Sequence, residues 1–345
     1  MVAKTWYSYA WTPLVALIGG AFATFVHWPL PWMIGALVAV VLVRCFTPWQ
    51  IQATPGGRKF GQWIVGVGIG LHFNVYVMEQ VLENLAPIVV GSLITTAVGG
   101  VAVWLMRAGG EQPATAYFSS MPGGSAEMVN LAQRNGGILH RVAAAQTLRV
   151  LIIVLTVPAL FKFFVGTPEI SPAYGSLDWS WLLILFPLGG FTGWWFQRLR
   201  KPNPWMFGPL LLSGTCSVIF DLHLRLPIGA SEFGQLMIGS SLGCYFDRTF
   251  FKEAPVFLAR SFIATCLMVL TAFLAAFGLG WTTAVDFRSL TLGMMPGGLA
   301  EMCLTAETLH LAVPVVTAMQ TLRLLFVLFL AEPVFLMWVK RTTSP

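Results

Sequence analysis

Long apolar runs, separated by short polar stretches, cover most of this chain. A membrane-spanning helix needs about 17–25 mostly apolar residues. Ten runs approach or reach that length, at residues 11–28, 30–46, 60–78, 85–106, 142–164, 181–196, 205–220, 233–246, 254–277 and 313–339. Several of them are short, so we expect some helices to be tilted, partial or re-entrant. The pattern predicts an all-α polytopic membrane protein.

The composition agrees with a lipid environment. Of the 345 residues, 57% are hydrophobic and only 10% are charged, whereas soluble proteins carry about 25% charged residues. The net charge of +6 is small, and the basic residues lie at the ends of apolar runs instead of on one face or tail, as a nucleic-acid binder would require. We therefore expect the lipid bilayer as a partner and no nucleic acid.

One unusual phrase occurs twice in the chain. It reads MPGGSAEM at residues 121–128 and MPGGLAEM at 295–302, and each copy is followed by Gln-Thr-Leu-Arg, at 146–149 and 320–323. A helix-breaking Pro-Gly-Gly, a single Glu and a single Arg thus lie within very apolar sequence. Lipid tolerates such residues only where protein or a water-filled cavity surrounds them.

The duplication extends along the whole chain. Three further pairs of segments match in order, at 31–35 and 204–208, 60–62 and 233–235, and 86–87 and 254–255. Because the offset stays nearly constant, we interpret the chain as two homologous membrane repeats, at 8–165 and 177–340. Glycines repeat after the second pair, and we expect them to serve close helix packing.

The charges of the loops favour repeats of opposite orientation. Cytoplasmic loops collect Lys and Arg. Residues 27–31 contain neither, whereas the corresponding loop of the second half holds three basic residues at 198–201. We therefore predict inverted repeats in a bacterial inner membrane, with both termini in the cytoplasm. Each repeat must then cross an odd number of times, which gives about ten spans plus two re-entrant or broken helices at the repeated phrases. Complete spans at both phrases would instead give twelve helices and parallel repeats.

Paired broken helices at the middle of the membrane form the binding site of many secondary transporters. An unwound Pro-Gly-Gly segment frees backbone carbonyls and N–H groups. If the helices restart at Ser125 and Leu299, the positive ends of their dipoles point to the same place. The alternative is a tight turn whose glycines serve only close approach.

The charged residues of both copies also allow two interpretations. Glu127 and Glu301 fall in the first turn of the restarted helices, where they could carry an ion or a proton, or could only stabilise the helix end. Arg149 and Arg323 lie deep in apolar runs, which requires a carboxylate, carbonyls or an anionic substrate as partner. The nearest carboxylates in sequence are the two glutamates, so a purely structural Arg–Glu tie is the other interpretation. The candidate binding residues are Pro122, Gly123, Gly124, Ser125, Glu127, Gln146, Arg149, Pro296, Gly297, Gly298, Glu301, Gln320 and Arg323.

With these motifs in view, the chain resembles the duplicated AbrB family of bacterial inner-membrane proteins over nearly its whole length. The resemblance rests on LPWMIGAL at 30–37, NPWMFGPL at 203–210, and both copies of Pro-Gly-Gly and Gln-Thr-Leu-Arg. It implies a fold similar to inverted-repeat transporters, such as cation–proton antiporters and bile-acid-type symporters, whose crossed broken helices form the binding centre. The family's pattern does not require Glu after Pro-Gly-Gly in every member, so it implies no obligatory role for Glu127 and Glu301.

Members of this family have been labelled as regulators and as ammonia monooxygenases. A monooxygenase of this kind needs a metal held by clustered His, Asp or Cys, and the five histidines and five cysteines show no such spacing. A transcription factor needs a DNA-reading module, and the longest polar stretch, at about 167–180, is too short for one. We therefore expect no enzyme, no metal and no cofactor.

The function expected from the sequence is secondary transport of a small, anionic solute, coupled to H⁺ or Na⁺, with the solute bound between the two Pro-Gly-Gly elements. The alternative is a membrane sensor that keeps the transporter fold and influences gene expression indirectly. Homodimer formation is left open.

Overall fold

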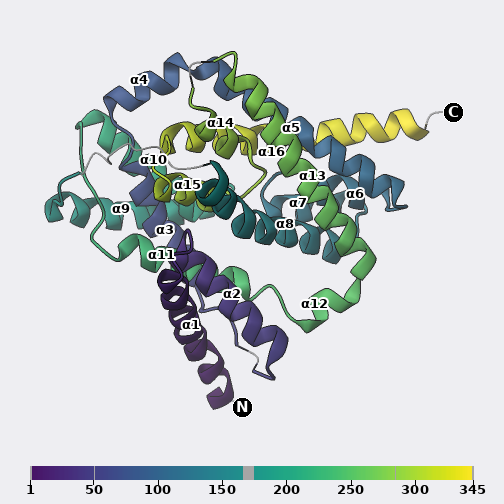
Figure 1. Cartoon of the computed structure of the whole chain (residues 1–345), viewed down its shortest axis with the longest axis horizontal. Coiled ribbons are helices and arrows are strands. Elements are labelled where there is room, and N and C mark those ends of the chain that lie inside the picture. Colours follow the sequence, from purple (N-terminus) through teal and green to yellow (C-terminus); the bar gives the residue numbers. More distant parts are fainter. Residues whose placement is uncertain (1, 50, 166–174, 284, 344–345) are drawn as a thin grey trace. The chain divides into compact units, whose positions relative to one another are not determined.

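The structure, a computed structural model, describes residues 2–49, 51–165, 175–283 and 285–343. Within these residues the regular structure is helical, apart from an isolated parallel bridge between Ser176 and Leu224 (Figure 1). The prediction of an all-α protein is confirmed.

The two halves of the chain give helices that correspond in order. In the first half they are α1 (Val2–Phe25), α2 (Pro31–Phe46), α3 (Gly57–Gly70), α4 (Val75–Glu83), α5 (Leu85–Ala108), α6 (Pro113–Ser120), α7 (Ser125–Arg134) and α8 (Leu139–Leu160), which ends in a π-helical turn (Phe161–Val165). In the second half they are α9 (Trp179–Arg198), α10 (Pro204–Ile219), α11 (Ala230–Gly243), α12 (Arg248–Glu253), α13 (Pro255–Gly280), α14 (Phe287–Met294), α15 (Leu299–Thr308) and α16 (Val313–Thr343).

Four stretches of helix are long and apolar enough to cross a membrane: Leu85–Ala108, Leu139–Phe164, Pro255–Gly280 and Val313–Val339. A fifth candidate is formed by α3 and α4 together, which are bent by 86°. Shorter apolar helices occur at Trp11–Phe25, Pro31–Phe46 and Pro204–Ile219. The chain is thus a membrane-type helical protein, and the count of about ten spans stays a prediction.

The chain divides into two compact units, and each contains segments of both halves. Unit 1 comprises Met1–Gln80, Val157–Phe251 and Cys303–Pro314, and unit 2 comprises Val81–Thr156, Lys252–Met302 and Val315–Pro345. The compact units therefore do not coincide with the predicted sequence repeats, whose boundaries at 8–165 and 177–340 stay a prediction.

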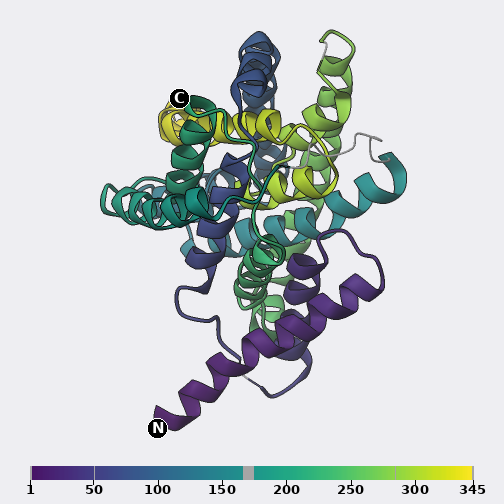
Figure 2. The ribbon, with the colours of Figure 1, turned by 90° about the vertical axis from the view of Figure 1, so that its left-hand side faces the viewer.

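In unit 1, neighbouring helices cross where glycine replaces a side chain. Helices α1 and α2 lie side by side in both views (Figures 1 and 2), and a Cβ on Gly35 would lie 2.2 Å from the carbonyl oxygen of Gly19. Helices α9 and α10 meet in the same way, since a Cβ on Gly208 would lie 2.7 Å from the backbone nitrogen of Gly193. The glycine of each Pro-Trp-Met phrase is therefore the point of closest backbone approach.

Unit 1 also interlocks the two halves of the chain. Helix α3 packs on α10, where a Cβ on Gly66 would lie 2.7 Å from the carbonyl oxygen of Met206. Helix α11 packs on α2 in the corresponding way, where a Cβ on Gly239 would lie 2.2 Å from the carbonyl oxygen of Met33. The prediction that these repeated glycines serve close packing is confirmed.

Unit 2 contains both Pro-Gly-Gly phrases, each packed against a helix of the other half. Helices α5 and α13 pack on each other. One buried cluster joins Phe118 and Met121, before and in the first phrase, to Val327 of α16. A second cluster joins Met294, just before the second phrase, to Ile88 of α5. Neither phrase is enclosed by its own half alone.

Candidate functional site

Both Pro-Gly-Gly phrases interrupt a helix at the same position. The residue that follows α6, Met121, has φ −65° and ψ 130°, and the residue that follows α14, Met295, has φ −61° and ψ 134°, both extended. Because proline has no backbone N–H, the helical hydrogen-bond pattern cannot continue through the phrase. The helices restart at Ser125 and Leu299, so the predicted breaks and restarts are confirmed.

A buried glutamine closes the end of each interrupted helix. The Nε2 of Gln146 donates to the carbonyl oxygens of Phe118 at 2.8 Å and Met121 at 3.0 Å. The Nε2 of Gln320 donates to those of Leu292 at 3.2 Å and Met295 at 3.0 Å. The last carbonyls of a helix have no partner within the helix, so both glutamines satisfy acceptors that the break leaves exposed. Their amides therefore support the backbone of the break, and a contact of either glutamine with a solute or ion stays a prediction.

The arginines hold the unwound backbone itself. The Nη1 of Arg149 donates to the carbonyl oxygen of Met121 at 2.8 Å, and its Nη2 donates to that of Gly123 at 3.3 Å. Arg323 repeats this with Met295 at 2.6 Å and Gly297 at 2.7 Å. Arg149 and Arg323 are only 3% and 4% exposed. Carbonyl oxygens thus supply polar partners that buried arginines require. From their distance along the sequence, the glutamates were the candidates named above.

The two glutamates fold back over the second glycine of their own phrase. A Cβ on Gly124 would lie 2.0 Å from Oε2 of Glu127, and a Cβ on Gly298 would lie 2.0 Å from Oε2 of Glu301. This places each carboxylate over the start of its own helix, where the dipole and the first N–H groups favour a negative charge. The pair is not equivalent, because Glu301 is 3% exposed and Glu127 is only half-buried. Ser125, the other candidate of this turn, is exposed.

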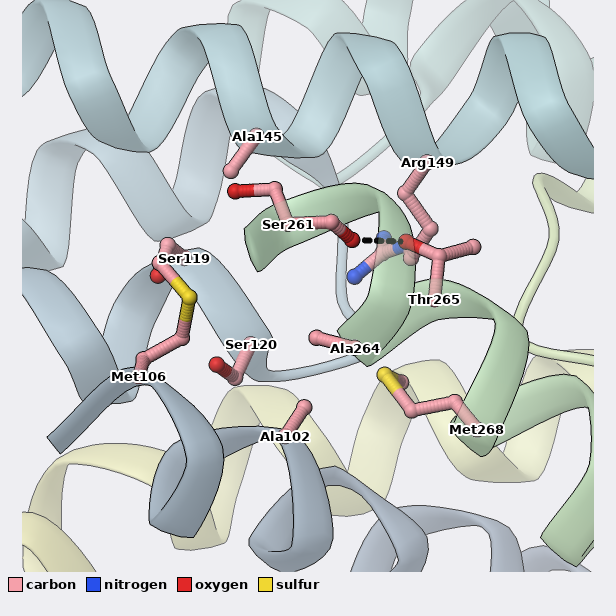
Figure 3. A pocket seen from close by; sticks show the side chains of 10 residues that line it. All are labelled: Ala102, Met106, Ser119, Ser120, Ala145, Arg149, Ser261, Ala264, Thr265 and Met268. Atoms are coloured by element: carbon pink, nitrogen blue, oxygen red, sulfur yellow. Dashed lines mark hydrogen bonds between the residues drawn. The ribbon is translucent and has the colours of Figure 1, made fainter. Parts of the chain in front are cut away.

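A small cavity lies beside the first phrase. Its volume is about 10 Å³, which is room for about one water molecule. Side chains of α5, α6, α8 and α13 surround it, each of them at most 5% exposed. They are Ala102, Met106, Ser119, Ser120, Ala145, Arg149, Ser261, Ala264, Thr265 and Met268 (Figure 3). All ten belong to unit 2.

Sequence reasoning missed the hydroxyl groups of this cavity. Ser119 and Ser120 directly precede the first phrase, where the second copy has Gly293 and Met294, and this difference between the copies is a signal that could have found them. Ser261 and Thr265 are four residues apart, hence on one face of an apolar helix. That spacing is also common in membrane helices that only pack together, so by itself it would not have identified these two residues as part of a cavity.

The corresponding space beside the second phrase is filled. A Cβ on Gly293 would lie 2.5 Å from the sulfur of Met319, and a Cβ on Gly91 would lie 2.5 Å from its methyl group. Met319 occupies the position that Ala145 holds in the first copy. The two phrases therefore share one backbone arrangement but differ in the space left next to the arginine. Within the part of the chain that the structure describes, no group of three or more metal-ligating side chains is found.

Comparisons with known proteins give relatives that cover most of this chain. A protein of Bacillus subtilis (strain 168), named "Uncharacterized protein YhjN", is 23% identical over 356 residues, covering 94% of this chain and 91% of the relative. A protein of Escherichia coli (strain K12), named "Putative regulator AbrB", is 26% identical over 319 residues, covering 88% of each. The model of the family described as "Transition state regulatory protein AbrB" matches residues 32–340. Because this match includes both halves of the chain and both Pro-Gly-Gly phrases, the protein belongs to the AbrB family.

Proposed function

We propose that this protein is a secondary transporter of a small anionic solute in a bacterial inner membrane, coupled to H⁺ or Na⁺. The observation that carries the proposal is the pair of interrupted helices in unit 2, each held by the same Gln and Arg contacts. Such paired breaks place backbone dipoles and carbonyls around a solute in many transporters. The proposed binding residues are the thirteen named from the sequence.

The lengths of the interrupted helices fit an inverted-repeat architecture. Helices α6 and α7 have 8 and 10 residues, which corresponds to about 12 and 15 Å. A hydrocarbon core is about 30 Å thick, so neither helix crosses it alone. We therefore retain two inverted repeats, about ten spans, two re-entrant or broken segments, and cytoplasmic termini as parts of the proposal.

Arg149 supports an anionic solute. Its Nη groups are engaged with backbone carbonyls, which are neutral, so its positive charge is not neutralised by those contacts. A buried charge is costly unless an opposite charge compensates it. A solute carboxylate would supply that compensation. We assign the coupling ion to the glutamates, because both carboxylates lie at the start of the restarted helices.

A membrane sensor is the second candidate function. Two observations favour it. The family is described as a regulatory protein and one relative is named a regulator, and the cavity beside Arg149 has room for about one water molecule. A sensor of this kind would bind the same solute without moving it. We assign neither candidate an enzymatic step or a cofactor.

The proposal is tested with the purified full chain in liposomes. Uptake of a panel of labelled carboxylates (acetate, lactate, succinate and glutamate) is measured under an inward proton or sodium gradient. We expect gradient-driven uptake of at least one solute, and a loss of tenfold or more in Glu301→Gln. The matched control is Glu79→Gln, on an exposed position of α4, which should transport normally. A folded protein that moves no solute of the panel under either gradient would contradict transport, and stabilisation by a solute without flux would favour the sensor.

A further inference from the structure

The cavity beside Arg149 contains a positive charge and no negative one. Its other lining side chains are alanines, methionines, serines and a threonine. The guanidinium has two of its nitrogens on carbonyl oxygens, whereas its buried Nε has no hydrogen-bond partner. An unsatisfied donor on a buried cation is expensive, and a cavity occupant of negative charge would satisfy both the donor and the charge.

A second donor lines the same cavity without a partner. The buried hydroxyl oxygen of Ser261 has no hydrogen bond, although its backbone carbonyl accepts one from Thr265 at 2.8 Å (Figure 3). The neighbouring hydroxyls of Ser119 and Ser120 donate to the carbonyl oxygen of Ala116, at 3.1 and 2.7 Å. Two unused N–H and O–H donors, both on side chains at most 5% exposed, therefore belong to residues that line a space of one water's size.

The second copy of the motif closes the equivalent space with methionine. Met319 stands at the position of Ala145 and Met294 at that of Ser120. Both methionines are fully buried, and Met319 packs against Gly293 and Gly91. The polar cavity is thus a feature of the first copy, created by small residues, and not a general product of the Pro-Gly-Gly turn.

From these observations we infer that unit 2 contains a single, asymmetric anion site, in which the Nε of Arg149 and the hydroxyl of Ser261 donate to one small anionic group. The group is either a free halide or one oxygen of a solute carboxylate, and the carboxylate source rests on the proposed transport function. Entry requires unit 2 to open, because every lining residue is buried. The site would anchor the anionic end of a solute beside the first phrase only.

Thermal unfolding of the full chain in detergent tests the inference without measuring transport. Sodium chloride, bromide or formate is titrated against sodium isethionate at constant ionic strength, since isethionate is too large for the cavity. We expect a saturable rise in unfolding temperature with chloride or formate. Saturation by formate with no response to halides assigns the carboxylate source, and saturation by halides alone assigns the halide source.

Two cavity variants and one matched control make the experiment decisive. Ala145→Met should weaken the apparent anion affinity at least tenfold, because it copies the closed arrangement of the second repeat. Ser261→Ala removes one donor to a charged group and should weaken it about tenfold, which keeps the test available if Ala145→Met does not fold. Met319→Ala, the reverse exchange at the corresponding position beside the second phrase, should leave the affinity of this site unchanged.

An ordered water, and no anion, in the cavity would overturn the inference. In that case the salt response is linear and the same for the wild type, Ala145→Met and Ser261→Ala. The outcome is separate from that of the flux experiment: anion binding with no uptake contradicts the transporter, whereas uptake with no anion response contradicts only this site.

Discussion

Single atoms decide which residues the repeated phrase accepts. The three atoms nearest to a Cβ on Gly124 all belong to Glu127, at 2.0, 2.9 and 3.6 Å. The backbone of Gly124 has φ −64° and ψ 132°, a conformation open to any residue. Glycine therefore serves here to leave room, and the Glu127 carboxylate occupies that room.

This reasoning predicts strong coupling between Gly124 and Glu127. Gly124→Ala should destabilise the protein by about 1 kcal/mol, because the new methyl group displaces the flexible end of the Glu127 side chain from the start of its helix. In the Glu127→Ala background the same change should cost little, since the remaining neighbours lie beyond 3.6 Å. A double-mutant cycle of unfolding free energies in detergent measures the coupling, which should lie within about 0.5–3 kcal/mol. Additive effects would show that the carboxylate does not lie over the glycine.

The sequence indicated which residues are special but not what they contact. Arg149 was predicted to need a buried polar partner, and the structure gives it one. The partner could not be predicted, because the Glu127 carboxylate, three residues past the break, and the carbonyls of the break itself satisfy the same requirement. Apolar sequence around Ser261 likewise hides its role, which depends on the contact of α13 with helices of the other half.

At the scale of elements, helices cross at the positions where glycine lets their backbones come into contact. The crossings of α1 with α2 and of α9 with α10 both use the glycine of a Pro-Trp-Met phrase, Gly35 or Gly208. Proline begins both α2 and α10, and the residue before it, Leu30 or Asn203, is left-handed with φ 48° or 45°. The phrase therefore fixes the start of a helix and its crossing point within five residues.

Alanine substitutions at these crossings should be unusually damaging. Gly35→Ala and Gly208→Ala each push a methyl group against backbone atoms that cannot rotate away, and we expect losses of about 1–3 kcal/mol or more. The control is Gly100→Ala in α5, where a Cβ meets nothing within 4 Å; it should be neutral or stabilising by up to about 1 kcal/mol. Unfolding free energies in mixed micelles provide the comparison. Equal effects at all three positions would contradict the proposed crossings.

Most helices of this chain follow from its apolar runs, while the two short helices before the phrases do not. Helices α6 and α14 have 8 residues each, too few for a hydropathy pattern to separate them from a re-entrant loop. From the sequence, only an interrupted segment could therefore be predicted at these positions. The contact of α3 with α10 is also hidden, because it joins segments far apart in the chain and leaves no local pattern.

At the scale of the whole molecule, the halves of the chain are shared between the units. Unit 1 takes its helices from both halves, and unit 2 does the same. Neither half contains all the segments of either unit. If the halves arose by gene duplication, each copy had to supply helix surfaces that pack against helices of the other copy.

The sharing predicts that the halves fold only together. If residues 1–170 and 171–345 are produced as separate chains, we expect each alone to be degraded or aggregated in the membrane. Produced together, they should copurify through an affinity tag on one half. The measurement is recovery of the untagged half from detergent extracts, with the uncut chain as reference. A single half that is recovered as a monodisperse, stable protein would contradict the exchange of helices.

The hydrogen bond from the Ser92 hydroxyl to the carbonyl oxygen of Met319 spans 227 residues, and that from Arg44 to the carbonyl oxygen of Phe246 spans 202. On a ribosome, the earlier partner of each pair enters the bilayer long before the later one exists. At about 5–20 residues per second, the delay is roughly 10–40 s. During that interval the polar groups of the newly inserted helices must stay hydrated or bound to insertion factors. The rate of synthesis and the supply of such factors therefore affect the yield of this protein.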